Sequence, residues 1–216
     1  MAGYSLNKDH EVTTEAALRD LFPPTHDLAT KKVQQKLDKH AQDFITRAPF
    51  VCLGTQDAKG KADVSPRGDP IGFVKILDEH TLAIPDRPGN NRLDSLTNIL
   101  SNPSVGLLFI IPGFDDTMRV NGRASLTRDP DLLEQLSVHE RAPRLAIVVK
   151  VDTVFIHCAK AFRRSKLWDP EHFQDRNTVP SLMKIVLDLT DGAPVDSAEQ
   201  DQLDEALEAE YQATLY

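Results

Sequence analysis

Two turn-forming segments of the sequence present arginine side chains in settings that suit an anionic ligand. The first, at positions 63–70 (DVSPRGDP), holds Arg67 between a proline and a glycine. Proline stiffens the backbone and glycine allows conformations that other residues resist, so such a turn can fix the direction of a side chain. Arginine is always charged and matches a phosphate or carboxylate with paired hydrogen bonds, which makes Arg67 a candidate anion ligand. The alternative is a tight surface turn in which Arg67 pairs with Asp63 or Asp69.

The second segment, at positions 84–92 (IPDRPGNNR), brings two arginines to the start of a predicted helix. Arg87 and Arg92 stand there with Asn90 and Asn91 between them. The unpaired N–H groups and the dipole at a helix N-terminus favour an anion and disfavour positive charge. Two arginines at this place therefore indicate a bound phosphate, although the asparagines alone could serve as turn formers or helix caps.

A third cluster of basic residues occurs at positions 157–170 (HCAKAFRRSKLWDP), in a chain that is otherwise acidic. Four cations precede the single tryptophan, Trp168, and they are Lys160, Arg163, Arg164 and Lys166. The cluster indicates an anionic and partly aromatic ligand. The alternative is a solvated basic face that balances the acidic end of the chain.

The sequence lacks the residue spacings typical of several other kinds of site. It has no His-x-x-x-His or Cys-x-x-Cys zinc spacing, no glycine-rich nucleotide loop after a strand and no Gly-x-Ser-x-Gly elbow. We therefore predict no metal site, and the catalytic residues stay unknown because no general acid, base or nucleophile stands out. His157 lies in an apolar run and is more typical of a core or interface residue than of a ligand.

Short runs rich in valine, isoleucine, phenylalanine and threonine dominate the middle of the chain. Segments of Gly, Pro, Asn and Asp separate them, which is typical of strands joined by turns. Six or seven strands at this spacing predict an antiparallel barrel or sandwich. The runs cover positions 50–55, 62–66, 72–77, 81–85, 105–112, 118–126 and 145–158.

Apolar residues at helical spacing predict helices around these strands. The longest of them begins at a cap, Thr30, and ends at position 48 before a proline. A helix over 91–101 would bury one face, made of Leu93, Leu96, Ile99 and Leu100. Shorter helices are expected near 14–20, 129–138 and 181–189, and an acidic final helix would begin with a capping box of Ser197 and Gln200.

Composition limits the classes of protein that fit this chain. Its 216 residues carry a formal net charge of −8, which disfavours a surface built to bind nucleic acid. No apolar run is long enough for a signal segment or a membrane span, so we expect a cytoplasmic protein with no membrane contact. We predict an N-terminal arm over 1–29, a barrel domain over 30–170 and a helical extension over 171–216.

Four segments of the chain, taken in order, resemble the pyridoxamine 5'-phosphate oxidase-related FMN-binding family, and within it a bacterial subfamily. They are the FVCLGTQDAKGKADVSPRGDP hairpin, the LAIPDRPGNNR loop with its helix, the VGLLFIIPG strand and the HCAKAFRRSKLW segment. The resemblance covers positions 33–170. It implies a mainly β fold with added helices, a six-stranded antiparallel split β-barrel, and a homodimer that binds two FMN molecules at the subunit interface.

The resemblance also implies which residues bind the cofactor. Contacts to the phosphate would come from the strand bearing Arg67 and from the loop that opens the following helix. The basic cluster would contact the flavin bound mainly by the other subunit, and Trp168 would cover that site. The residues so assigned are Ser65, Arg67, Gly68, Asp86, Arg87, Asn90, Asn91, Arg92, Lys160, Arg163 and Arg164.

The chain departs from the oxidase itself at two places. Neither an Arg-x-x-Leu-Leu-Lys strand nor a C-terminal Arg-x-His-Asp-Arg segment is recognisable, so we do not predict oxidation of vitamin B6. We expect an FMN-dependent oxidoreductase of unknown substrate, with NADH or NADPH as a possible electron donor. The alternatives are a non-catalytic flavin-binding or sensor module, or a split barrel that uses deazaflavin or haem.

Overall fold

The computed structural model describes residues 3–190 and 192–216. The chain divides into two compact units, 1–33 and 34–216. The first unit contains a 3-10 helix, η1 (Lys8–His10), and the helices α1 (Glu15–Asp20) and α2 (Asp27–Lys31). Thr14 caps α1 by accepting a hydrogen bond from the N–H of Ala17, which confirms the short helix expected near this position. The division into three parts predicted from the sequence stays a prediction.

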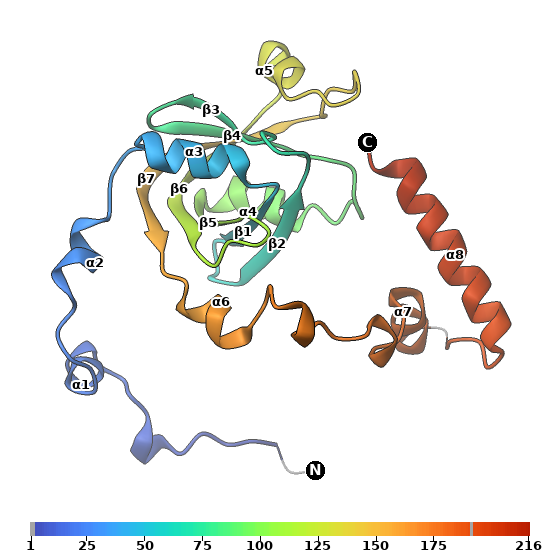
Figure 1. Ribbon diagram of the computed structural model, residues 1–216, viewed down its shortest axis with the longest axis horizontal. Coiled ribbons are helices and arrows are strands. Elements are labelled where there is room, and N and C mark those ends of the chain that lie inside the picture. Colours follow the sequence, from blue (N-terminus) through green and yellow to red (C-terminus); the bar gives the residue numbers. More distant parts are fainter. Residues whose placement is uncertain (1–2, 191) are drawn as a thin grey trace. The chain divides into compact units, whose positions relative to one another are not determined.

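The second unit is built on one antiparallel sheet, as the alternation of its runs predicts (Figure 1). Its strands pair in the order β2-β1-β5-β6-β7-β4-β3, which confirms a mainly β fold with added helices. The sheet has seven strands where the resemblance implies six, and among the described residues no pairing joins β2 to β3, so it is not closed. The strands are β1 (Phe50–Gln56), β2 (Ala62–Gly68), β3 (Lys75–Asp78), β4 (Thr81–Pro85), β5 (Ser104–Ile110), β6 (Thr117–Thr127) and β7 (Ala146–His157).

Alternate residues of the strands build the core on one face of the sheet. In β1, Val51 and Leu53 are fully buried while their neighbours are half-buried, and Leu107 and Phe109 of β5 repeat the pattern. Strand β4 is buried along its whole length. Its two faces pack against two separate apolar clusters, so the end of β4 is a firmly held point from which the chain enters the next loop.

The helix predicted from Thr30 to position 48 is wrong in its first half. Helix α3 (Lys39–Arg47) begins only after Asp38, whose side chain accepts a hydrogen bond from the N–H of Ala41. Residues 30 and 31 end helix α2, and the stretch between α2 and α3 is not helical, because Gln34 exchanges two backbone hydrogen bonds with Val154. Pairing with a distant strand therefore replaces the local helical pattern. Helix α3 packs on β3, β6 and β7 (Figure 1).

Helix α4 (Asp94–Ser101) confirms the predicted helix but not its predicted face. Leu96 and Ile99 are buried against β1, β2 and β6, whereas Leu93 and Leu100 are exposed. Leu93 lies outside the helix with a left-handed backbone, and this shifts its side chain from the expected stripe. Helix α5 (Pro130–Gln135) follows β6 and precedes β7 along the chain, and it covers the outer face of β4.

Four short helices and one long helix follow the last strand. The short ones are α6 (Lys160–Ser165), η2 (Pro170–His172), η3 (Arg176–Thr178) and α7 (Leu182–Leu189), and the long one is α8 (Ser197–Thr214). The predicted capping box of α8 is wrong, because Asp196 caps the helix by accepting a hydrogen bond from the N–H of Ala198. Gln200 is instead buried, and its amide donates to Ser181 and Asp204. Its side chain therefore ties α8 to the start of α7.

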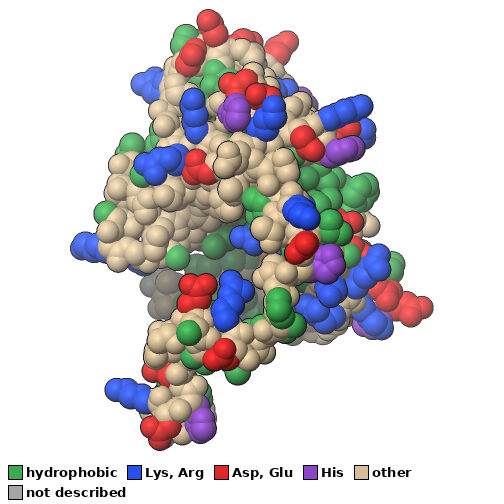
Figure 2. All heavy atoms as spheres, turned by 90° about the vertical axis from the view of Figure 1, so that its left-hand side faces the viewer, with side chains coloured by type: hydrophobic (Ala, Val, Ile, Leu, Met, Phe, Trp, Pro, Cys, Tyr) green, Lys and Arg blue, Asp and Glu red, His purple; other side chains and the backbone are tan. Residues whose placement is uncertain are grey.

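Charged side chains of both signs are interspersed over the face drawn in Figure 2. No continuous basic surface is visible on that face. In the described part of the chain, no helix combines the length and the apolar character needed to cross a membrane.

Candidate functional site

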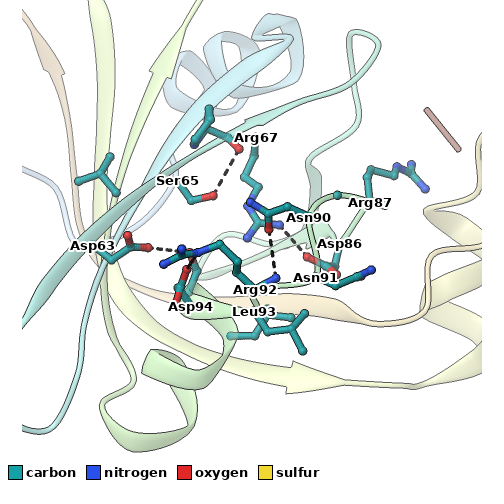
Figure 3. Close-up of a pocket in the computed structure, with 15 residues that line it drawn as sticks. Asp63, Ser65, Arg67, Asp86, Arg87, Asn90, Asn91, Arg92, Leu93 and Asp94 are labelled. Atoms are coloured by element: carbon teal, nitrogen blue, oxygen red, sulfur yellow. Dashed lines mark hydrogen bonds and ion pairs between the residues drawn. The ribbon is translucent and has the colours of Figure 1, made fainter. Parts of the chain in front are cut away.

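A cavity of about 270 Å³ lies between β2, the loop that follows β4 and the start of α4 (Figure 3). Two of the three arginine-bearing segments singled out in the sequence, 63–70 and 84–92, meet here. The lining residues are Asp63, Val64, Ser65, Pro66, Arg67, Asp86, Arg87, Gly89, Asn90, Asn91, Arg92, Leu93, Asp94, Ser95 and Leu96.

Strand β2 turns one face toward the cavity. Side chains alternate across a strand, so Asp63, Ser65 and Arg67 share the half-buried face while their neighbours are exposed. The Ser65 hydroxyl has only a long contact of 3.5 Å with the carbonyl oxygen of Pro66. Gly68 ends the strand and pairs with Phe50, and it does not line the cavity.

The Arg67 guanidinium is fixed in place but incompletely bonded. Its Nη1 donates to Asp86 Oδ1 at 2.6 Å, and both side chains are only 18% exposed. Its Nε is fully buried and has no hydrogen-bond partner among the described residues. Burying an N–H donor without an acceptor costs on the order of 1–3 kcal/mol, so this atom points to an acceptor that the described residues do not supply.

The start of α4 offers further donors to the same cavity. Its cap position, Leu93, has a left-handed backbone (φ 61°), and its side chain makes no capping hydrogen bond. Asn91 is also left-handed (φ 55°), and the side chain of Asn90 accepts a hydrogen bond from the N–H of Arg92. Because the first-turn N–H groups of a helix have no intrahelical partner, this uncapped end favours an anion. Two strained non-glycine residues in one loop are typical of a functional site.

Arg92 lines the cavity from its exposed side. Its Nε donates to Asp94 Oδ2 at 2.7 Å, and the hydrogen bond and charge of Asp94, helped by Asp63, raise the pKa of Arg92 above its usual range. The Arg92 side chain is 72% exposed, so it can change partner at little cost. Beneath it, the buried Ser95 hydroxyl donates to Asp63 at 3.2 Å.

Arg87 is directed elsewhere. Figure 3 shows its side chain turned away from Arg67 and Arg92. Its Nε donates to Asp69 Oδ2 at 2.6 Å, and its Nη2 donates to the carbonyl oxygen of Leu136 at 2.8 Å. Arg87 thus lines the cavity, but its guanidinium is engaged in a second, more buried ion pair.

The third basic cluster does not reach this cavity within the chain. Lys160, Arg163 and Arg164 are exposed on α6, and Arg163 pairs with Asp115. Trp168 donates its ring N–H to the carbonyl oxygen of Phe114 at 2.8 Å and packs against Phe162. None of the three cations, nor Trp168, is among the residues that line the cavity.

Three aspartates line the cavity, and the sequence singled out two of them: Asp86 as a site residue and Asp63 as an alternative partner of Arg67. Asp94 was not singled out. Within the cavity Arg67 pairs with Asp86 and Arg92 pairs with Asp94, whereas Arg87 pairs with Asp69, which does not line the cavity. The alternative of a local pair between Arg67 and Asp63 or Asp69 is not what the structure shows, because Asp86 from the other segment holds Arg67. Chemically the site presents oriented donors for an anion.

Comparison with known proteins places this geometry in context. The family model described as pyridoxamine 5'-phosphate oxidase matches residues 37–158, more than half of the chain. No curated protein matches the sequence.

Several solved structures are similar to this chain. HupZ from Group A Streptococcus is 18% identical, with 55% of this chain and 92% of that chain covered and a TM-score of 0.45. General stress protein 26 from Bacillus anthracis is also 18% identical, with coverages of 53% and 88% and a TM-score of 0.42. An FMN-binding protein from Syntrophomonas wolfei is 10% identical, with coverages of 54% and 88% and a TM-score of 0.41.

Proposed function

Because this chain belongs to the pyridoxamine 5'-phosphate oxidase family, we propose that it is a flavoprotein that binds FMN through the phosphate group. The buried Nε of Arg67, which has no partner among the described residues, is the observation that carries the proposal. A phosphate oxygen would satisfy this donor, and a guanidinium suits a phosphate because it can donate two parallel hydrogen bonds.

The other donors of the cavity fit the same ligand. The Ser65 hydroxyl and the uncapped N–H groups of Asp94, Ser95 and Leu96 surround the space beside Arg67. The exposed guanidinium of Arg92 can exchange Asp94 for a phosphate oxygen. Asp86 would keep Arg67 oriented, and Asn90 and Asn91 would shape the loop.

The test compares FMN with riboflavin, which has the same ring system and no phosphate. We expect wild-type protein to bind FMN at least about tenfold more tightly than riboflavin, since hydrogen bonds to charged groups contribute about 1.5–3 kcal/mol. Arg67→Lys keeps the positive charge but loses the planar guanidinium that can donate two parallel hydrogen bonds. It should weaken FMN binding about tenfold while leaving riboflavin binding unchanged.

Arg123→Lys is the matched control, because Arg123 is exposed on β6 and does not line the cavity. Equal affinities of the wild-type protein for FMN and riboflavin would refute the phosphate site. The absorption spectrum of the purified protein separates a flavin from haem, which has an intense Soret band.

We propose further that the protein is a cytoplasmic FMN-dependent oxidoreductase. When bound, FMN supplies electron or hydride transfer, and the protein contributes binding and orientation. Consumption of NADH or NADPH by the reconstituted protein, measured against a flavin-depleted control, tests turnover. A protein that binds FMN and shows no turnover with any donor would be a binding or sensor module.

The proposed assembly is a homodimer with FMN at the subunit interface. In it Lys160, Arg163 and Arg164 of one subunit would lie against the flavin held mainly by the other, where positive charge raises the reduction potential of the ring. Lys160→Ala should then lower the midpoint potential in an anaerobic titration. Unchanged potentials in alanine variants of all three residues would remove them from the site.

A further inference from the structure

Among the described residues, the ion pair with the least exposed side chains is formed by Asp69 and Arg87, and Arg87 also lines the proposed phosphate cavity. The Asp69 side chain is 2% exposed and that of Arg87 is 14% exposed. One carboxylate oxygen, Oδ2, accepts from Arg87 Nε at 2.6 Å, and the other, Oδ1, accepts from the Tyr216 hydroxyl at 2.8 Å. A buried carboxylate needs donors on both oxygens, and Tyr216 supplies the second one.

The aromatic ring of Tyr216 contacts both a guanidinium and an imidazole ring. The Arg87 guanidinium carbon lies 5.6 Å from the ring centroid, within cation–π range. The His139 ring packs edge-on at a centroid distance of 5.3 Å, and Arg141 Nη1 donates to the carbonyl oxygen of Tyr216 at 2.6 Å. We call Asp69, Arg87, His139 and Tyr216 the Tyr216 clamp. It joins four separate segments of the chain.

The clamp is connected to the partner of Arg67 by one peptide bond, the bond between Asp86 and Arg87. Arg87 follows Asp86, which holds Nη1 of Arg67, and both residues line the cavity. Fixing the Arg87 side chain therefore fixes the start of the loop over 86–93 and with it the direction of the Asp86 carboxylate. A loop held in its binding conformation loses less entropy when a ligand arrives, which increases affinity.

We propose that Tyr216 is a positioning residue for the phosphate cavity, holding the 86–93 loop through Asp69 and Arg87 and so setting the preference for a phosphorylated flavin. This role deepens the proposed function and rests on it. Tyr216 is not among the residues that line the cavity, so it would act only through the clamp.

The protonation of Tyr216 agrees with this role. The hydrogen bond to Asp69, together with burial and the charge of that carboxylate, raises the pKa of Tyr216, although Arg87 opposes the shift. The hydroxyl therefore stays protonated and remains a donor across the neutral pH range.

Two readouts test the clamp, with Tyr211 as the matched control. Tyr211 is an exposed tyrosine on α8. In flavin-free protein, Tyr216→Ala should speed hydrogen exchange of the amides in 86–93 about tenfold, and Tyr211→Ala should not. In binding assays, Tyr216→Ala should weaken FMN binding about three- to tenfold and leave riboflavin binding unchanged. Tyr216→Phe keeps the ring and should give a smaller change of the same kind, which guards against misfolding of the alanine variant.

The outcomes separate the clamp from the phosphate site. Unchanged exchange in both Tyr216 variants overturns the clamp. Faster exchange with no selective loss of FMN affinity overturns its role in phosphate recognition. If wild-type protein binds FMN no better than riboflavin, the proposed function fails, while the exchange experiment still decides whether Tyr216 holds the loop.

Discussion

A single carboxylate, Asp86, holds the guanidinium of Arg67 and also lowers its attraction for other anions. The pair is only 18% exposed on each side, so solvent screens it weakly. A phosphate that enters the cavity gains the free donors of Arg67 but meets the charge of Asp86. Asp86 therefore favours phosphate binding by orienting Arg67 and disfavours it by repelling the phosphate.

We predict that Asp86→Asn tightens FMN binding about three- to tenfold. The asparagine oxygen can still accept from Arg67 Nη1, while the negative charge is removed. The measurement is a fluorescence titration with FMN, with riboflavin as the control that should not respond. Weaker FMN binding would show that the charge of Asp86 is needed to orient Arg67.

A second residue-scale prediction concerns Asp78, the last residue of β3 before the turn to β4. The backbone N–H of His80 donates to its carboxylate at 2.7 Å, and this hydrogen bond is the main reason that the pKa of Asp78 lies below its usual range. A carboxyl with a depressed folded-state pKa stabilises the fold fully above its unfolded-state pKa, about 4, and loses that effect as pH falls through the folded-state pKa.

Asp78→Ala should therefore lower the melting temperature at pH 7 and make progressively less difference as the pH falls below about 4. Thermal melts across this range give the measurement. Asp116→Ala, at an exposed aspartate in another turn, provides the comparison. A difference that is equally large at pH 7 and at pH 3 would contradict the proposed cause.

At the scale of elements, the bulge between β6 and β7 depends on one glycine. The register shifts at Asn121/Gly122, and a Cβ on Gly122 would overlap the carbonyl oxygen of Lys150. Such bulges bring two backbones closer than a side chain allows. These two strands form the longest pairing of the sheet, so their spacing affects the whole core.

Gly122→Ala should lower the free energy of unfolding by at least about 2 kcal/mol, measured by urea denaturation. Gly106→Ala on the neighbouring β5 is the matched control, because its Cβ would meet only the Asn121 side chain at 3.6 Å. We expect that control to stay within about 0.5 kcal/mol of wild type. Equal effects of the two substitutions would mean that the bulge tolerates a side chain.

The success of sequence reasoning differed between elements for identifiable reasons. The strands could be predicted because their alternation is written in consecutive residues, as in Val51 and Leu53. The helix from Thr30 failed because the backbone pairing of Gln34 with Val154 joins residues 120 positions apart, which no local pattern reveals. Likewise the cavity arginines could be recognised as residue types, while the pairing of Arg67 with Asp86 depended on how two segments meet.

At the scale of the whole molecule, the proposed dimer leads to a prediction about shared sites. If Arg67 of one subunit and Lys160 of the other serve the same flavin, neither the Arg67→Lys nor the Lys160→Ala homodimer contains an intact site. Mixed dimers of the two variants should contain one intact and one doubly altered site. Light scattering should give twice the mass of the chain, and mixing should restore a fraction of sites with wild-type affinity and potential. A monomer, or mixed samples that behave as the average of the parents, would contradict the shared site.

The two open edges of the sheet also restrict how copies of the chain can meet. Strand β2 contains Pro66, which has no N–H to donate, and β3 is only four residues long, begins with Lys75 and is irregular between Ile76 and Asp78. Short, charged or proline-bearing edges discourage the addition of a further strand. Pro66, which precedes Arg67 in β2, thereby also guards this edge of the sheet against edge-to-edge aggregation. Two subunits would therefore have to join through faces and loops rather than by extending a common ladder of backbone hydrogen bonds.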